Sequence, residues 1–117
     1  MSQKNRDVLV VYVNEPKLLD ERVIGETAEE LLKLVERAEK RMLLVNFQHV
    51  RFMSSAMLGK LVSLYKNCQK QKVNLKFSNV QKEIAEIFKI TGMDKIFKIY
   101  GDENQALLAF EKDGWGI

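Results

Sequence analysis

The stretch Leu43–Tyr65, with the sequence LLVNFQHVRFMSSAMLGKLVSLY, decides the predicted fold. An apolar run at 42–47 overlaps the beginning of this stretch. The run is short, compatible with β-structure and bounded by charge, and it therefore predicts a buried strand. A polar passage follows at 48–51. Over 55–69, apolar side chains recur every three or four positions, which predicts a helix with one buried face. That face consists of Leu58, Leu61, Val62, Tyr65 and Cys68.

Two serines, Ser54 and Ser55, stand where this helix is expected to begin. Serine is a favoured N-cap, because its hydroxyl accepts a hydrogen bond from a free N–H group of the first turn. The pair could have this structural role alone. A second interpretation is a regulated site, because a phosphate at a helix N-terminus meets unpaired N–H groups and the positive end of the helix dipole. Phosphorylation would also add roughly two negative charges to the surface.

The segment 52–59, FMSSAMLG, follows a hydrophobic strand and resembles the signature of STAS domains, as found in bacterial anti-sigma factor antagonists. The usual pattern of that family is a hydrophobic pair followed by Asp, Ser, Ser or Thr, Gly, Leu and Gly. In this register Ser55 matches the phosphorylated serine, with Ser54 as the alternative acceptor. Leu58 and Gly59 match the last two positions of the pattern. The chain departs from it at three positions: Ser54 stands in place of the Asp, Ala56 in place of the second hydroxyl residue, and Met57 in place of the first Gly.

Strands and helices are expected to alternate along the rest of the chain. We predict strands at 8–13, 42–47, 73–77 and 96–100, with a brief one at 17–19. Helices are predicted from Asp20, with the ordered part beginning nearer Thr27 because of Gly25, then at 55–69, at 80–91 and from Asp102 or Glu103. The first helix is expected to bury Ala28, Leu31, Leu32, Val35 and Ala38. This alternation predicts an α/β fold with a largely parallel sheet and right-handed crossovers.

The resemblance implies the same architecture, a STAS-like fold with a small mixed, mostly parallel sheet of four to five strands faced by about four helices. A length of 117 residues, 46% of them hydrophobic, predicts one domain over 1–117 with a buried core. Residues 1–6 are expected to be a short disordered lead. Trp115 lies in a Gly-flanked tail, where it would either fold back over the core or remain exposed.

Composition argues against several classes of function. The net charge of +3 is mild, and basic residues alternate with acidic ones, so we expect no direct nucleic-acid binding. The chain has a polar N-terminus and no apolar run of membrane-spanning length, so a cytoplasmic protein without membrane association is expected. Cys68 is the only cysteine and falls on the apolar helix face, which predicts a buried, inert thiol in a reducing compartment.

Catalytic constellations are also missing from the sequence. His49 is the only histidine, and a lone histidine in a loop is more often solvated than a general base. No cluster of histidines or cysteines has the spacing of metal ligands, and the six glycines do not form a phosphate-binding loop. We therefore expect a protein that is not an enzyme and that needs no metal or cofactor.

The resemblance implies a regulatory protein that binds an anti-sigma factor serine kinase and is released from it by serine phosphorylation. The expected partner surface consists of His49, Arg51, Ser54, Ser55, Met57 and Asn79. Asn79 is included because the carboxyl ends of neighbouring parallel strands lie on the same side of a sheet. Two alternatives stay open: a constitutive, unphosphorylated STAS scaffold in a larger assembly, and a module that binds a nucleotide or lipid in the strand-end crevice. The sequence does not identify the kinase or the sigma factor, and it does not indicate the oligomeric state.

Overall fold

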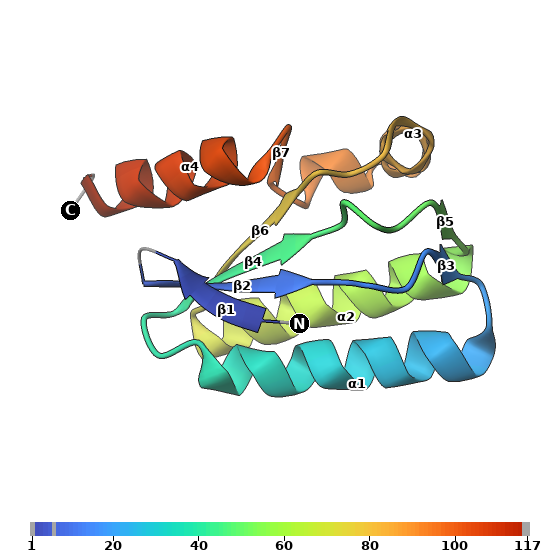
Figure 1. The fold of residues 1–117 in the computed structure, drawn as a ribbon, viewed down its shortest axis with the longest axis horizontal. Helices are drawn as coiled ribbons and strands as arrows, with labels where there is room; N and C mark the ends of the chain where they lie inside the picture. The colour runs from blue at the N-terminus through green and yellow to red at the C-terminus, as the bar shows by residue number, and fades with distance from the viewer. Residues whose placement is uncertain (1, 6, 116–117) are drawn as a thin grey trace.

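A five-stranded sheet forms the centre of the molecule in a computed structural model of the chain, which describes the backbone of residues 2–5 and 7–115 and the side chains of residues 7–113 (Figure 1). The strands, in spatial order, are β1 (Ser2–Asn5), β2 (Val8–Tyr12), β4 (Met42–Asn46), β6 (Asn74–Ser78) and β7 (Ile99–Tyr100). β1 runs antiparallel to β2, and the other neighbours are parallel. A separate two-stranded parallel sheet joins β3 (Lys17–Leu18) to β5 (Phe52–Met53).

Helices cover both faces of the central sheet. They are α1 (Glu21–Arg37), α2 (Ser55–Gln71), α3 (Lys82–Ile90) and α4 (Glu103–Trp115), with a short 3-10 helix η1 (Met93–Lys95) after α3. α1 and α2 pack side by side on one face, whereas α4 lies on the other (Figure 1). The predicted mixed, mostly parallel sheet with about four helices is therefore confirmed.

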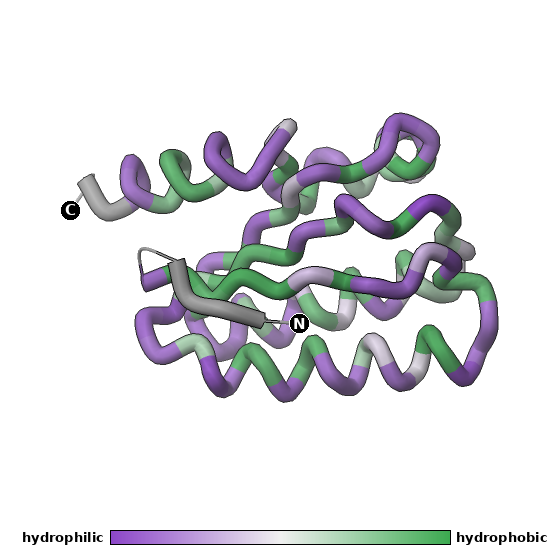
Figure 2. The backbone as a smooth tube through the Cα atoms, viewed as in Figure 1, coloured by the Kyte–Doolittle hydropathy of each residue, from purple (hydrophilic) through white to green (hydrophobic). Residues whose placement is uncertain are grey.

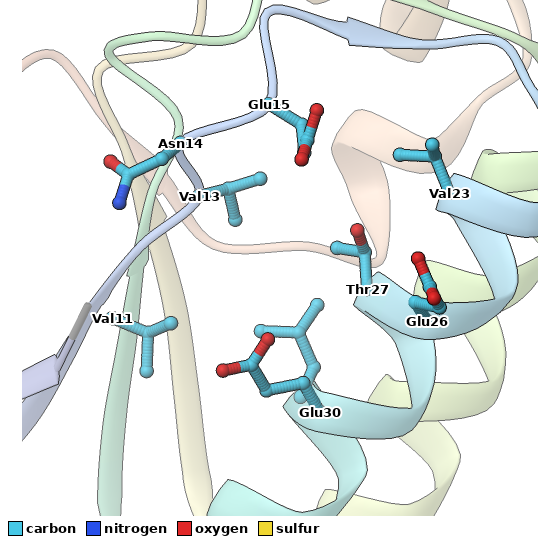
Figure 3. Close-up of a pocket in the computed structure, with 9 residues that line it drawn as sticks. Val11, Val13, Asn14, Glu15, Val23, Glu26, Thr27 and Glu30 are labelled. Atoms are coloured by element: carbon cyan, nitrogen blue, oxygen red, sulfur yellow. The ribbon is translucent and has the colours of Figure 1, made fainter.

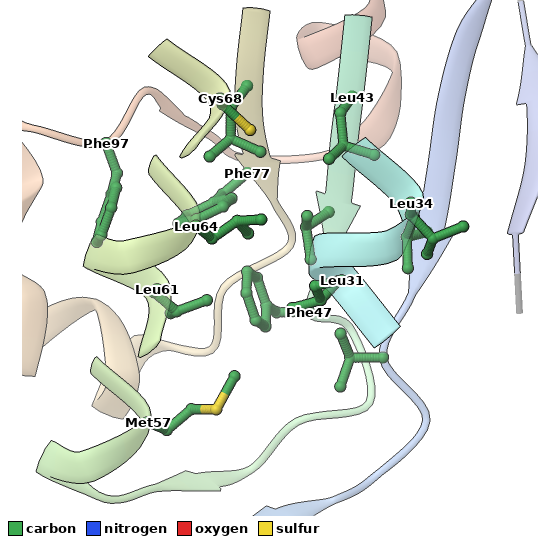
Figure 4. Packing of buried hydrophobic residues seen from close by; sticks show 14 of the residues in the cluster. Leu31, Leu34, Leu43, Phe47, Met57, Leu61, Leu64, Cys68, Phe77 and Phe97 are labelled. Atoms are coloured by element: carbon green, nitrogen blue, oxygen red, sulfur yellow. The ribbon is translucent and has the colours of Figure 1, made fainter. Parts of the chain in front are cut away.

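The main core lies between the sheet and the helix pair α1 and α2. Leu43 and Val45 of β4 point into it, while Leu44, between them, points towards α4. Both faces of β4 are thus buried, which explains why its sequence is a continuous apolar run instead of an alternating one. Figure 2 shows β2 and β4 as largely hydrophobic and the outward side of α1 as largely hydrophilic. Phe47 and Phe77 meet edge to face in this core, with ring centroids 5.1 Å apart (Figure 4).

The first residues of the chain correct one expectation. Residues 2–5 are not a disordered lead but strand β1, which pairs with β2 from Ser2 opposite Val11 to Asn5 opposite Val8. Their polar sequence hid this strand, because backbone pairing to a neighbour does not require apolar side chains. Residues 1 and 6 lie outside the described residues, as does the side chain of Trp115.

Helix α1 begins at Glu21, next to the predicted start at Asp20, and its ordered part is not delayed to Thr27. Asp20 is its N-cap, and its carboxylate accepts hydrogen bonds from the backbone N–H groups of Arg22 at 2.7 Å and Val23 at 3.4 Å. This cap fixes the first turn, so Gly25 is accommodated inside the helix. The buried stripe also differs from the prediction, because Leu34 packs into the core and Leu32 is 38% exposed.

The last predicted strand is shorter than expected. Gly92 adopts a left-handed conformation with φ of 76° and ends α3, and η1 follows it. Only Ile99–Tyr100 of the predicted 96–100 pairs with the sheet. Phe97 lies in the core against the rings of Phe77 and Phe88, at 4.8 and 5.7 Å. Phe97 is therefore buried without being part of the strand, whereas Ile96 is 40% exposed.

Helix α4 is attached to the sheet by a small apolar contact and two polar anchors. Ala106, Leu107 and Phe110 form the contact, packing on Val8, Val10 and Leu44. At the start of the helix, the Glu103 carboxylate accepts hydrogen bonds from the Tyr12 hydroxyl at 2.7 Å and the Asn46 amide at 3.2 Å. Near its end, Asp113 lies 2.8 Å from the ammonium group of Lys76, a side chain of β6 that is fully buried. Sequence periodicity did not indicate either anchor.

Candidate functional site

The passage from β4 to α2 is held in place by the chain segment around β3. The backbone N–H groups of Arg51 and Phe52 both donate to the carbonyl of Pro16, at 2.8 and 3.0 Å. The N–H of Ser54 donates to the carbonyl of Leu18 at 3.0 Å. These three bonds fix the start of α2 at the edge of the molecule where the parallel strands end.

The two serines at this helix start have different environments. Ser54 is the N-cap by backbone conformation, and its carbonyl accepts from the N–H groups of Met57 and Leu58 at 3.1 and 3.3 Å. Its hydroxyl oxygen is buried and finds no hydrogen-bond partner among the described residues. Ser55 is the first residue of the helix and its side chain is exposed. An enzyme acting from solution would therefore reach Ser55 more readily than Ser54.

The capping geometry gives a stability prediction with a matched pair of variants. Asp20→Ala, which removes the two cap bonds of α1, is expected to lower the free energy of unfolding by about 1 kcal/mol. Ser54→Ala is expected to change the free energy of unfolding by less than about 0.5 kcal/mol, because the Ser54 hydroxyl makes no cap bond to a described residue. Its removal also eliminates a buried polar group that has no hydrogen-bond partner among the described residues. Urea unfolding of both variants measures the difference. Equal losses would show that Ser54 caps α2 through its side chain.

His49 and Arg51, two residues of the expected partner surface, lie in the loop between β4 and β5, which precedes α2. Both side chains are exposed, and they line a shallow cavity of about 390 Å³. The other residues that line this cavity are Asn14, Pro16 and Gln48, which sequence reasoning did not select. All three lie in the loops that follow β2 and β4, and this position is the signal that could have found them.

Asn79 lies in the loop after β6, with a left-handed backbone conformation of φ 58°. This loop and the loop after β4 are joined, because the side-chain amide of Gln81 donates to the carbonyl of Gln48 at 3.0 Å. The oxygen of the Asn79 side-chain amide is buried and has no hydrogen-bond partner among the described residues. The structure therefore brings the loop of Asn79 to the same edge as His49, as expected from the parallel topology.

Met57 must be removed from the predicted partner surface. Its side chain is fully buried and belongs to the main core, with Leu61 and Phe47 nearby in the same cluster (Figure 4). The reason is helical geometry: Met57, Leu61, Leu64 and Cys68 recur three or four residues apart, so they share the inward face of α2. The prediction treated Met57 as part of an exposed motif and overlooked this period.

Two exposed apolar side chains near the helix start were not predicted as surface residues. Phe52 and Leu19 are each 53% exposed, and their segments run together where β3 pairs with β5. The ammonium group of Lys17 lies 6.0 Å from the centre of the Phe52 ring. The candidate site therefore combines apolar, basic and hydroxyl side chains, which is a surface chemistry suited to protein binding.

Two observations concern metal binding and thiol chemistry in the described residues. No group of three or more His, Cys, Asp or Glu side chains among them could hold a metal ion. Burial raises the pKa of the Cys68 thiol to about 11, so the nucleophilic thiolate is scarce at neutral pH, as the sequence predicted for an inert thiol. No helix in the described part of the chain is long and apolar enough to cross a membrane.

The fold agrees with a comparison to protein families. Residues 1–106 match the model of the STAS domain. The chain belongs to the STAS domain family. The resemblance first noted at 52–59 thus extends over nearly the whole sequence.

Solved STAS structures resemble this one at low sequence identity. An anti-sigma factor antagonist from Mycobacterium paratuberculosis is 23% identical, with a TM-score of 0.77 over 93% of this chain and 90% of that one. SpoIIAA, a cell fate determinant of Bacillus solved in its phosphorylated form, is 14% identical, with a TM-score of 0.67 over 94% and 97%. The STAS domain of a SulP transporter from Vibrio cholerae is 16% identical, with a TM-score of 0.75 over 98% and 89%. These likenesses concern the STAS fold.

Proposed function

We propose that this STAS protein acts as an anti-sigma factor antagonist, which binds an anti-sigma factor serine kinase and is switched by phosphorylation of Ser55. The observation that carries the proposal is the exposure of Ser55 at the first position of α2, in the register that matches the phosphorylated serine of the family. Ser54 is the less suitable acceptor, because its hydroxyl oxygen is buried. Structural similarity to an anti-sigma factor antagonist and to phosphorylated SpoIIAA supports the same reading.

The physics of the switch is electrostatic. A phosphate on Ser55 would sit at the positive end of the α2 dipole, beside the first backbone N–H groups of the helix. It would add roughly two negative charges beside an exposed apolar residue, Phe52, and so oppose the docking of a partner by repulsion and by the loss of hydration. The proposed partner surface comprises His49, Arg51, Ser54, Ser55 and Asn79, with Phe52 and Leu19 as apolar contacts.

Intact-mass spectrometry after incubation with ATP and the serine-kinase anti-sigma factors of the same organism tests this function. We expect a gain of one phosphate that maps to Ser55 and disappears in Ser55→Ala. Ser54→Ala is the matched control and should retain the modification. Binding of the kinase, followed by calorimetry, should weaken at least tenfold on phosphorylation.

Two results would change the proposal. A phosphate mapped to Ser54 would keep the switch and move its acceptor by one residue. Partner affinity that is the same for phosphorylated and unphosphorylated protein would refute the switch.

A constitutive STAS scaffold is the second candidate function, favoured by the departures from the family signature. Ser54 replaces the acidic residue before the phosphoserine, and Met57, which replaces a glycine, has become a core residue. STAS domains also occur outside sigma-factor control, as in the SulP transporter of Vibrio cholerae. Binding without phosphorylation by any candidate kinase, together with intact interactions in Ser55→Ala, would support this function instead.

A further inference from the structure

A second concave site lies between the end of β2 and α1, away from the serine motif. This β2–α1 pocket has a volume of about 180 Å³ (Figure 3). Its floor is apolar and consists of Val11, Val13, Val23 and Leu31. Its rim is polar and consists of Asn14, Glu15, Glu26, Thr27 and Glu30. The pocket therefore offers an apolar base under a rim that contains three carboxylates.

Among the residues whose side chains the structure describes, two of the three carboxylates have no charge partner. Glu26 lies 2.9 Å from the guanidinium group of Arg22 and is paired with it. The carboxylates of Glu15 and Glu30 make no ion pair or hydrogen bond with any residue whose side chain the structure describes. Figure 3 shows Glu15 extending from the loop after β2 towards α1, and Glu30 extending from α1 towards β2. An occupant of this pocket would meet negative charge on both sides.

The shape and the chemistry of the pocket together define its occupant. Its volume is well below the roughly 300–1,000 Å³ of typical small-molecule sites, so it suits one long side chain. An aliphatic stem would cover the apolar floor while a cationic head reached the rim. Arginine fits best, because its planar guanidinium offers five donors and can bond a single carboxylate through two parallel hydrogen bonds, whereas lysine presents a point charge. The carboxylates do not form a metal site with other described residues.

We propose that the β2–α1 pocket receives an arginine side chain of a partner protein. Asn14 lines both this pocket and the cavity beside His49 and Arg51, so the two sites share one loop. A partner that docks at the helix start could therefore extend its contact to the pocket. The inference does not rest on phosphorylation of Ser55, since it follows from the pocket alone.

Titration of the free protein with the peptide acetyl-Ala-Arg-Ala-amide, followed by NMR of backbone amides, tests the proposal. We expect shifts concentrated at Val13, Thr27 and Leu31, with a dissociation constant in the millimolar range, on the order of 1–10 mM. The same peptide with citrulline has nearly the same shape without the charge and should bind at least tenfold more weakly. The double variant Glu15→Gln/Glu30→Gln should also lose at least tenfold in affinity.

Glu29→Gln is the matched control, because Glu29 lies on the same helix but pairs with Lys33 at 3.6 Å and does not line the pocket. It should bind the arginine peptide like the unaltered protein, and Ser55→Ala should do so as well. Absence of shifts at the pocket, equal binding of the citrulline peptide, or an equal effect of Glu29→Gln would overturn the proposal. Equal binding of acetyl-Ala-Lys-Ala-amide would overturn the assignment to arginine.

Discussion

Met57→Ala is expected to lower the free energy of unfolding by about 3 kcal/mol, within the usual range of about 2–5 kcal/mol for truncating a buried methionine. The side chain is fully buried against the main core, so its removal forfeits apolar burial and leaves a cavity between α2 and the sheet. Urea unfolding monitored by circular dichroism measures the loss. Because three backbone bonds hold the start of α2, we expect the fold to be kept.

The control for this prediction is Lys60→Ala, an exposed position of the same helix, which should alter stability by less than about 0.5 kcal/mol. Met57→Leu, which conserves volume, should cost less than about 1.5 kcal/mol. If Met57 were instead a contact for the partner, Met57→Ala would leave stability unchanged and weaken binding. That result would restore Met57 to the partner surface.

Asp113→Ala is expected to lower the free energy of unfolding by about 2 kcal/mol. Breaking a buried ion pair by removing one partner commonly costs about 3–5 kcal/mol, and we reduce this figure because the Asp113 side chain is 44% exposed. The loss arises because Lys76 stays fully buried, with the rings of Tyr100 and Phe110 at 5.4 and 5.0 Å from its ammonium group. Thermal and urea unfolding of the variant test this prediction.

A double-mutant cycle with Lys76→Met separates the ion pair from simple packing. Lys76→Met places an apolar chain of similar length in the core and should be neutral or stabilising, because Asp113 can hydrate. The double variant should be clearly more stable than Asp113→Ala alone, since it no longer buries an unpaired charge. Additive losses in the cycle would show that the two side chains are not coupled.

The same pair predicts a dependence of stability on pH. The hydrogen bond from Lys76 lowers the pKa of Asp113 below its ordinary value, and the bond from Asn74 adds to this. A carboxyl group whose pKa is lower in the folded state than in the unfolded state stabilises the fold when it is ionised. This stabilisation is complete above the ordinary pKa of about 4, and it is lost as the pH falls through the lower pKa of the folded state. Asp113→Ala should therefore be less stable than the unaltered protein at pH 7, and the gap should narrow below about pH 4.

Local patterns in the sequence were enough to predict the architecture. The apolar run at 42–47 and the alternation of strands and helices determined a mostly parallel α/β sheet, because burial on both faces and helical spacing leave clear periodic signatures. The signature at 52–59 identified the helix start and Ser55. The sequence prediction failed where the structure depends on backbone hydrogen bonds. Strand β1 has a polar sequence and was not predicted, and α1 begins at its Asp20 cap although Gly25 lies in its second turn.

Tertiary structure alone decided which polar groups meet across the fold, whereas the burial of Met57 follows from the helical period that it shares with Leu61, Leu64 and Cys68. Met57 stands two residues from Ser55 in sequence, yet it is buried while Ser55 is exposed, because the rotation of the helix separates them. Lys76 and Asp113 lie 37 positions apart and meet only because α4 folds over β6. The β2–α1 pocket likewise joins a loop to a helix face. Such juxtapositions follow from how the elements pack, and no local period in the sequence encodes them.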